Sequence, residues 1–169
     1  MQEFLRTERR RSRTYPAWGC QTSPVLKTPE ERVRASFARQ GLLATLGARV
    51  TRVAPGEVDV ELAFDERLTQ QHGYLHAGAL TAALDSACGY AALTLMPEEA
   101  AVPSVEFKVN LLAPAEGERF LARGRVVRAG RTLTVCRGDA VAFAGDDERH
   151  VATMVATMMA LGPRDGQAG

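Results

Sequence analysis

The longest apolar stretch of the chain runs from Ala79 to Leu93, and its apolar residues cover every side of a helix about five turns long. A helix of this kind is typical of the middle of a protein core. Asp85 lies inside the stretch, where an ionised carboxylate is costly to bury unless another group compensates its charge. The pattern leaves two interpretations of Asp85: an acid paired within the core, or a catalytic acid tuned by its surroundings.

Alternation of apolar and polar residues predicts strands on both sides of this helix. In residues 57–64 the even positions are apolar and most odd positions are acidic, so one face packs on a core and the other meets water. Pro55-Gly56 predicts a turn that joins this strand to an earlier one over residues 47–53. After Pro97 the alternation returns, with one face formed by Val105, Phe107, Val109 and Leu111.

The last third of the chain predicts three more strands. Residues 119–128 and 131–143 form a predicted hairpin about Ala129-Gly130, where glycine supplies the positive φ of a tight turn. The alternation slips at Gly138, which predicts a β-bulge there. The final strand, residues 150–161, has two largely apolar faces, which indicates a second partner beyond the helix, such as another subunit.

The order of elements predicts an α+β fold with one domain. Thr28-Pro29-Glu30-Glu31 provides an N-cap, a proline at the first helical position and a glutamate for a capping box, so a helix is expected to about Gln40, ended by Gly41. Helix, two strands, long helix and four strands give an antiparallel sheet packed on a central helix. We place this domain at residues 25–163, between a basic, solvated or loosely docked tail (1–24) and a C-terminal tail (164–169).

Composition excludes several classes of protein. A chain of 169 residues that is 46% hydrophobic, with net charge +1, can bury a substantial core and presents no nucleic-acid-binding charge. No run of 18 or more apolar residues predicts a membrane span, and no apolar segment follows the N-terminal arginines, as a signal peptide requires. The three cysteines form no C-x-x-C pair, and two lie in apolar elements, so we expect free thiols and a cytoplasmic location.

A motif precedes the long helix: Gln70-x-x-Gly73-x-x-His76-Ala77-Gly78, followed by Asp85. It resembles the Asn/Gln-x-x-Gly-x-x-His-Gly-Gly-x₆-Asp signature of hotdog-fold acyl-CoA thioesterases, particularly the phenylacetate-degradation type. The likeness includes the flanking strands, from about residue 42 to residue 161. Two positions differ: alanine replaces the first glycine, and glutamine stands where this branch usually has asparagine, although the 4-hydroxybenzoyl-CoA branch uses glutamine. The resemblance implies a hotdog fold that hydrolyses an acyl-CoA substrate and needs no cofactor.

Thioester hydrolysis needs one group that polarises the carbonyl and another that attacks it or activates water. Free N–H groups and the positive end of the dipole at a helix N-terminus suit the first task, and an alanine at position 77 retains its N–H. By resemblance, the Ala77 amide is the oxyanion donor, and Gln70 hydrogen-bonds the carbonyl or orients water. Asp85 is, by resemblance, either the nucleophile or the general base, with both roles open.

The histidines and glycines of the motif can also be explained by structural or binding roles, without a direct part in proton transfer. A histidine at a helix start more often caps or orients than transfers protons, and by resemblance His76 fixes the loop, with direct proton transfer as the alternative. Gly73 and Gly78 are the expected substrate-binding positions of the same loop. His72 and His76 are four apart, but glycine lies between them in a predicted loop without a nearby third ligand, so no metal site is expected.

Coenzyme A carries phosphates, for which arginine and lysine are the usual partners. Arg128 and Arg131 lie near predicted strand ends and Lys108 on an outward face, and we expect the two arginines to contact the substrate. Two alternatives to a thioesterase remain: an acyl-CoA-binding hotdog protein that does not hydrolyse, which the Ala77 departure favours, and a hotdog dehydratase or hydratase, whose motifs the chain lacks.

The spacing of the motif also predicts the assembly. Ala77 and Asp85 are eight residues apart, so on one helix their backbones are about 12 Å apart along the axis. One thioester cannot easily meet both groups in the same chain, because attack requires atoms about 3 to 3.5 Å apart. A two-fold partner with an antiparallel helix brings the two groups together, so we expect a homodimer, or a homotetramer built as a dimer of dimers.

Overall fold

The computed structural model describes residues 28–162, so the two predicted tails and Cys20 lie outside the described residues. Within that part, the helices are α1 (Pro29–Phe37), α2 (Gly41–Thr45) and α3 (Ala77–Leu93), with a 3₁₀ helix η1 (Glu66–Leu68) between β2 and α3. The strands are β1 (Arg49–Ala54), β2 (Glu57–Ala63), β3 (Ser104–Leu111), β4 (Arg119–Ala129), β5 (Leu133–Ala144) and β6 (Asp147–Met159).

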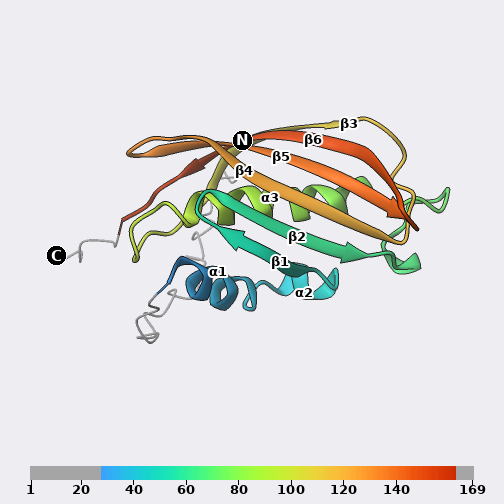
Figure 1. Ribbon diagram of the computed structural model, residues 1–169, viewed down its shortest axis with the longest axis horizontal. Helices are drawn as coiled ribbons and strands as arrows, with labels where there is room; N and C mark the ends of the chain where they lie inside the picture. Colours follow the sequence, from blue (N-terminus) through green and yellow to red (C-terminus); the bar gives the residue numbers. More distant parts are fainter. Residues whose placement is uncertain (1–27, 163–169) are drawn as a thin grey trace, which may run out of the picture.

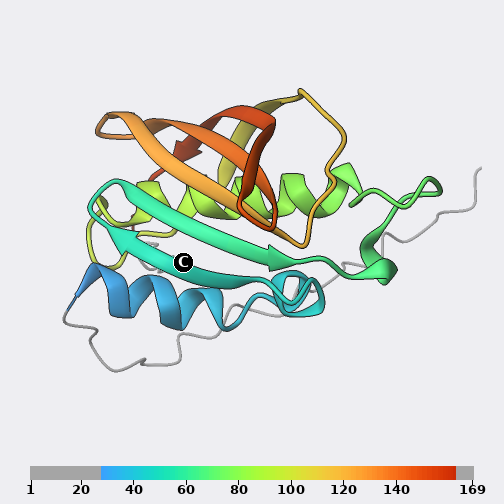
Figure 2. The ribbon, with the colours of Figure 1, turned by 45° about the vertical axis from the view of Figure 1, so that its right-hand side comes forward.

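The six strands form one antiparallel sheet in the order β1-β2-β4-β5-β6-β3. The sheet curves around α3, and α1 and α2 lie beside β1 at one edge, as Figures 1 and 2 show. This confirms the predicted α+β fold with one long central helix and a short N-terminal helix. None of the helices within residues 28–162 has the length and apolar character needed to cross a membrane.

The start of α1 agrees with the prediction, but its end does not. The Thr28 hydroxyl accepts a hydrogen bond from the Glu31 N–H at 3.1 Å, and the Thr28 N–H donates to the Glu31 carboxylate at 3.0 Å, which completes a capping box. The helix ends at Phe37 instead of about Gln40. Gly41 begins α2 instead of ending a helix, since the Gln40 N-cap backbone is extended.

Arg32 joins α1 to the far end of α3. Its guanidinium donates to the carbonyl oxygens of Pro97 at 2.5 Å and Met96 at 3.0 Å, and also to that of Leu93. These carbonyls lie at and just after the end of α3, where i→i−4 hydrogen bonds run out; those of Leu93 and Pro97 also accept the Met96 and Ala100 N–H groups, whereas Arg32 is the donor to Met96. Burial lowers the pKa of Arg32, against the opposing effect of Glu98. One side chain therefore bonds three carbonyls and fixes α1 against α3.

Two glycines let α3 approach the sheet closely. Gly124 and Gly138 are paired on β4 and β5, and a Cβ at Gly124 would lie 2.3 Å from the backbone of Ala87 in α3. A Cβ at Gly138 would lie 2.9 Å from the Cys88 sulfur. The predicted bulge at Gly138 is wrong, because the register there is regular; glycine is present for close packing. The register shifts instead at four other places, each between two residues of one strand: Val50 and Arg52 in β1, Ser104 and Glu106 in β3, Val126 and Arg128 in β4, and Ala140 and Val141 in β5.

The reason predicted for glycine at position 130, a positive φ in the turn of the second hairpin, also needs correction. Gly130 lies in the β4–β5 turn, but its φ is outside the left-handed region. A Cβ there would sit 2.6 Å from the carbonyl oxygen of Leu133, so close approach is the reason for glycine. Positive φ is found instead at Gly145, φ 58°, in the turn between β5 and β6.

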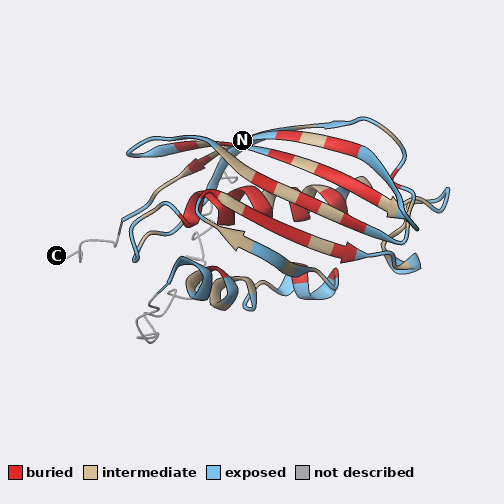
Figure 3. Ribbon diagram, viewed as in Figure 1, coloured by how far each residue is buried: buried red, intermediate tan, exposed pale blue. Residues whose placement is uncertain are grey.

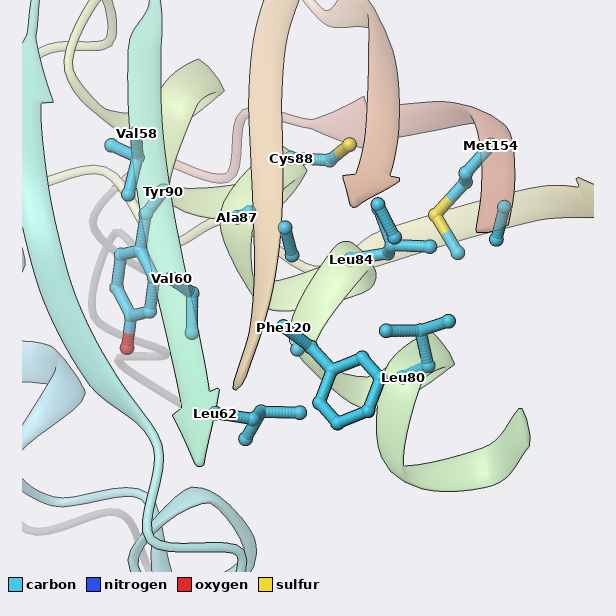
Figure 4. Close-up of a cluster of buried hydrophobic side chains, with 14 of the residues drawn as sticks. Val58, Val60, Leu62, Leu80, Leu84, Ala87, Cys88, Tyr90, Phe120 and Met154 are labelled. Atoms are coloured by element: carbon cyan, nitrogen blue, oxygen red, sulfur yellow. The ribbon is translucent and has the colours of Figure 1, made fainter. Parts of the chain in front are cut away.

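The core lies between α3 and the inner face of the sheet. Figure 4 shows its centre, and Figure 3 shows the alternating burial along the strands; the fully buried side chains include Val58, Val60, Leu62, Leu80, Leu84, Phe120 and Met154. The apolar pattern predicts that the core encloses α3 on every side. The sheet instead leaves one side of the helix open. A stripe at helical spacing is only half-buried or exposed, formed by Gly78, Thr81, Ala82, Asp85 and Ser86. Asp85 therefore lies on an open side of the helix.

The edge strand β3 leaves apolar residues in contact with solvent. Phe107 is 44% exposed and Leu111 is 56% exposed, although both pair with buried β6 residues on the helix side of the sheet. The register shift in β3 makes Val105 the extra residue and places Ser104 opposite Met158. The prediction that Val105 continues the face of Phe107 is thus wrong, and Ser104 takes that position. On the other face of β6, Val155 is 53% exposed.

Two buried thiols and the half-buried carboxylate of Asp139 have shifted pKa values. Cys88 and Cys136 are free and buried, as expected; burial raises the pKa of both thiols, that of Cys136 to about 11. On β5, Asp139 accepts hydrogen bonds from Arg137 at 3.1 Å and Thr153 at 2.8 Å. Burial acts to raise the pKa of Asp139, but these bonds outweigh it and hold the pKa below its usual range.

Candidate active site

His76 caps the N-terminus of α3. Its Nδ1 accepts a hydrogen bond from the Gly78 N–H at 2.8 Å, while its own backbone is extended, with φ −63° and ψ 134°. A capping role is what a histidine at a helix start predicts. The Gly78 amide is therefore occupied. The Ala77 amide, one residue earlier, has no acceptor among residues 28–162 and is the N–H left for a ligand.

The loop before the helix is a tight turn built on Gln70 and Gly73. The Gly73 N–H donates to the Gln70 carbonyl at 3.0 Å, and Gly73 has φ 84°, which glycine adopts without strain. The Gln70 N–H donates to the Tyr74 carbonyl at 2.9 Å. The side-chain oxygen of Gln70 accepts from the His72 N–H, so the side-chain amide nitrogen is the end left for a ligand.

Gln70 and Ala77 meet in one pocket, which we call the amide pocket. It has a volume of about 500 Å³ and its remaining wall is almost entirely apolar. That wall consists of Tyr74, Leu75, Leu80, residues 111–115 and Val151.

Asp85 lies in a separate pocket, which we call the acid pocket, also of about 500 Å³. The Ser104 hydroxyl donates to Asp85 Oδ1 at 2.6 Å, and within residues 28–162 the other oxygen, Oδ2, has no hydrogen-bond donor. Oδ2 is therefore the atom that can attack a carbonyl or accept a proton from water. The rest of the wall is Ser36, Arg39, Gln40, Ser86, Gly89, Tyr90, Leu93 and residues 100–102.

Sequence reasoning missed Ser104 and the contribution of α1 to this pocket. Ser104 faces Asp85 because of the extra residue in β3, and an alternating pattern does not reveal which residue a bulge displaces. The pocket wall also includes Ser36 of α1 and Arg39 and Gln40 of the turn after it. The sequence pattern predicts a helix for this segment but does not indicate that it lines a pocket. The helical spacing of Asp85, Gly89 and Leu93 is the one signal that could have marked this wall.

The remaining candidates lie outside both pockets. Arg128 and Arg131 are exposed beside the tip of the β4–β5 hairpin, and Lys108 is exposed on β3 opposite Val155. His72 is exposed in the loop. Within the described part of the chain, no three histidine, cysteine, aspartate or glutamate residues are grouped as metal ligands would be.

Comparisons with known proteins bear on this geometry. The family model described as "Thioesterase superfamily" matches residues 72–148. The crystal structure of a thioesterase family protein from Silicibacter pomeroyi is 58% identical, with a TM-score of 0.79, and the match covers 80% of this chain and 99% of that one. The Escherichia coli PaaI protein from the phenylacetic acid degradation operon has a TM-score of 0.72 at 18% identity, covering 79% of this chain and 94% of PaaI. The PaaI likeness shows the fold alone, and it agrees with the predicted hotdog fold.

Curated relatives match a shorter part of the chain. The medium/long-chain acyl-CoA thioesterase YigI of Escherichia coli is 29% identical over 98 residues, which cover 50% of this chain and 61% of YigI. A putative esterase from Saccharolobus solfataricus is 34% identical over 90 residues, 53% of this chain and 64% of the relative. The chain thus spans somewhat less than two thirds of the length of these relatives.

Proposed function

Because the chain belongs to the thioesterase superfamily, we propose that it is an acyl-CoA thioesterase that releases a free acid and coenzyme A. The observation that supports this most directly is the Asp85–Ser104 pair in a pocket beside an otherwise apolar helix. A carboxylate held in place by a serine hydroxyl, with one oxygen open to the pocket, suits a nucleophile or a general base.

The proposed reaction uses one group from each pocket. The Ala77 N–H, with the positive end of the α3 dipole, stabilises the negative charge that develops on the thioester oxygen. The Gln70 amide hydrogen-bonds the same oxygen or orients water. Asp85 Oδ2 either takes a proton from the attacking water or attacks the carbonyl carbon itself. The C–S bond breaks, and the thiolate of coenzyme A leaves and takes up a proton, which in the general-base route is the one that Asp85 took from water. In the nucleophile route the acyl group remains on Asp85 as an anhydride, and water then hydrolyses it to the free acid and restores the carboxylate.

Two chains form each site in this proposal. Ala77 and Asp85 line different pockets of one chain, eight residues apart on α3, a separation of about 12 Å along the axis. An antiparallel two-fold partner places the amide pocket of one chain opposite the acid pocket of the other. The solvent-exposed apolar residues of β3, Phe107 and Leu111, support a partner on this side of the molecule.

Release of free thiol from a panel of acyl-CoAs tests the activity. Asp85→Asn keeps the shape of the side chain and should lower turnover by at least about a hundredfold, a typical scale for loss of a general base, while the protein stays folded. Near-normal turnover would remove Asp85 from the mechanism. Binding of acyl-CoA without thiol release would favour the second candidate, a non-hydrolytic acyl-CoA-binding protein, for which the alanine at position 77 is the supporting observation.

Mixing inactive variants tests the two-chain site. Asp85→Asn and Gln70→Ala, each nearly inactive alone, are allowed to exchange subunits, with exchange followed by mass. If each site uses both chains, every heterodimer has one intact site, and activity returns toward about a quarter of wild type at equal mixing. If one chain supplies the whole site, every site keeps a lesion and no activity returns.

Arg128 and Arg131 are the proposed contacts to the coenzyme A phosphates, since both are exposed guanidinium groups near one hairpin tip. Replacing both by alanine should raise KM for acyl-CoA about tenfold, a scale of one charge-assisted hydrogen bond. The same change should leave KM unaltered for acyl-N-acetylcysteamine, a thioester without the nucleotide. Equal effects on both substrates would exclude phosphate contact.

A further inference from the structure

The wall of the acid pocket beyond Asp85 carries a hydrogen-bonded polar cluster, formed by Ser36, Gln40 and Tyr90. The Gln40 side-chain amide donates to the Tyr90 hydroxyl at 2.7 Å, and that hydroxyl donates to the Ser36 oxygen at 3.2 Å. The Tyr90 side chain is 4% exposed, and its ring packs against Phe37 with centroids 5.8 Å apart. Tyr90 is thus held between α3 and α1 with its polar end at the pocket.

Within residues 28–162 this cluster leaves two donors and one acceptor, the Gln40 side-chain oxygen, without partners. The Ser36 oxygen accepts from Tyr90, so its own proton is free to donate, and the second N–H of the Gln40 amide also lacks an acceptor among residues 28–162. Arg39 lines the same pocket, and no carboxylate between residues 28 and 162 pairs with it. An unsatisfied donor is costly once a ligand displaces water. The cluster therefore suits an acceptor oxygen brought by the ligand.

The spacing of these residues along α3 gives a first scale for the length of the acyl group. Asp85, Gly89 and Leu93 recur at four-residue spacing along the pocket wall, with Tyr90 next to them. Asp85 and Tyr90 are five residues apart, so they are separated by about 7.5 Å along the helix axis. This is a separation of backbones; an extended carbon chain advances somewhat less than its ~1.5 Å bond length per carbon, so a chain of about six carbons covers a distance of this size.

From the unused donors of this cluster we infer that the enzyme selects acyl groups that carry a hydroxyl or carboxylate oxygen at the end far from the thioester, and the axial spacing makes a six-carbon chain the first to test. The inference rests on the proposed thioesterase function, because Asp85 must hold the thioester for the far end to reach Ser36 and Gln40. These two residues and Tyr90 then act on specificity, and they take no part in the chemical step.

Hexanoyl-CoA, 6-hydroxyhexanoyl-CoA and adipoyl-CoA test the inference, because they differ only at the far end. The kcat/KM of at least one oxygenated compound should exceed that of hexanoyl-CoA about tenfold, the scale of one hydrogen bond. A higher value for adipoyl-CoA than for the hydroxy compound assigns a carboxylate to Arg39, and the reverse order assigns a hydroxyl. Hexanoyl-CoA hydrolysed as well as both others overturns the inference and leaves the proposed function standing.

Variants connect the preference to the cluster. Tyr90→Phe keeps the ring against Phe37, and Gln40→Leu keeps the size of the side chain; in each, the ratio of oxygenated to plain substrate should fall toward one. Arg34→Gln is the matched control, because Arg34 lies on α1 outside the acid pocket, and it should leave the ratio unchanged. A ratio that survives both cluster variants overturns the inference.

Failure of the function itself is read separately. If none of the three thioesters is hydrolysed, the proposed function fails, and calorimetry is done with ketone analogues in which a CH₂ group replaces the sulfur. Tighter binding of an oxygenated analogue, lost in Tyr90→Phe, still supports the polar far end. Equal or absent binding of the three analogues overturns it.

Discussion

Replacing Ala77 by proline deletes a single N–H from the proposed oxyanion site. Ala77 is the first residue of α3, a position where proline is favoured because its fixed φ suits the helix. The preceding residue must then be extended, and His76 already has ψ 134°. The lost N–H has no acceptor among residues 28–162, so no internal hydrogen bond is broken. The structure therefore predicts a variant that folds normally.

The expected loss concerns catalysis alone. Removing one oxyanion donor typically costs about 3 kcal/mol of transition-state stabilisation, so kcat/KM should fall by about a hundredfold or more. The free energy of unfolding should change by less than about 1 kcal/mol, because proline fits this position. Thiol release measures the first quantity and urea unfolding the second.

Two control variants separate the N–H from the added bulk. Ala77→Val adds carbon atoms and keeps the donor, and Ala77→Gly keeps the donor and restores the residue of the family signature. Both should retain far more activity than the proline variant. A folded proline variant with wild-type kcat/KM would refute the oxyanion assignment, and a valine variant as inactive as proline would attribute the loss to bulk.

Three other predictions concern packing and ionisation. Gly124→Ala should lower the free energy of unfolding by about 3 kcal/mol or more in thermal or urea unfolding, because its Cβ would meet the backbone of α3 at 2.3 Å. The control Gly41→Ala, with nothing within 4 Å of its Cβ, should change that free energy by less than about 1 kcal/mol, and equal stability of the two variants would contradict the close packing. In a Cys20→Ser background, neither Cys88 nor Cys136 should react with Ellman's reagent at pH 8 until urea is added, because burial raises the pKa of Cys136 to about 11 and that of Cys88 further. Rapid reaction in the folded state would show that the core opens. The pKa of Asp139 is depressed in the folded state, so its stabilising contribution is present above its unfolded pKa of about 3.9 and is lost as the pH falls through the folded value. In Asp139→Asn the free energy of unfolding should therefore fall less steeply as the pH is lowered through this range, and an unchanged pH dependence would refute the assignment.

Much of the fold follows from local patterns, and the errors have a common cause. Alternation located the strands, and the apolar run located α3, because both depend on residues near in sequence. The pattern predicts a bulge at Gly138 and a positive φ at Gly130, but each is glycine because another part of the chain comes too close for a Cβ. Close approach between distant segments leaves no mark in a local pattern.

The candidate site divides in the same way. The motif places Ala77 and Asp85 on one helix, and their spacing predicts a site shared between two chains, which stays a prediction; in one chain the two residues line different pockets. Ser104 was missed because a bulge in β3 decides which residue turns toward Asp85. The cluster of Gln40 and Tyr90 joins residues 50 apart in sequence, which only the tertiary fold brings together.

The Arg32 contacts have a consequence for redesigning the chain. Any attempt to exchange residues 28–40 for the corresponding segment of a relative, to alter the accepted acyl group, also exchanges the residue that bonds the carbonyls of Leu93, Met96 and Pro97. A graft without arginine at position 32 leaves the Met96 carbonyl without a donor among residues 28–162, takes one hydrogen bond from each of the other two carbonyls and leaves the new segment loosely seated. A transplanted specificity segment therefore works as a unit only if it brings its own attachment to the central helix.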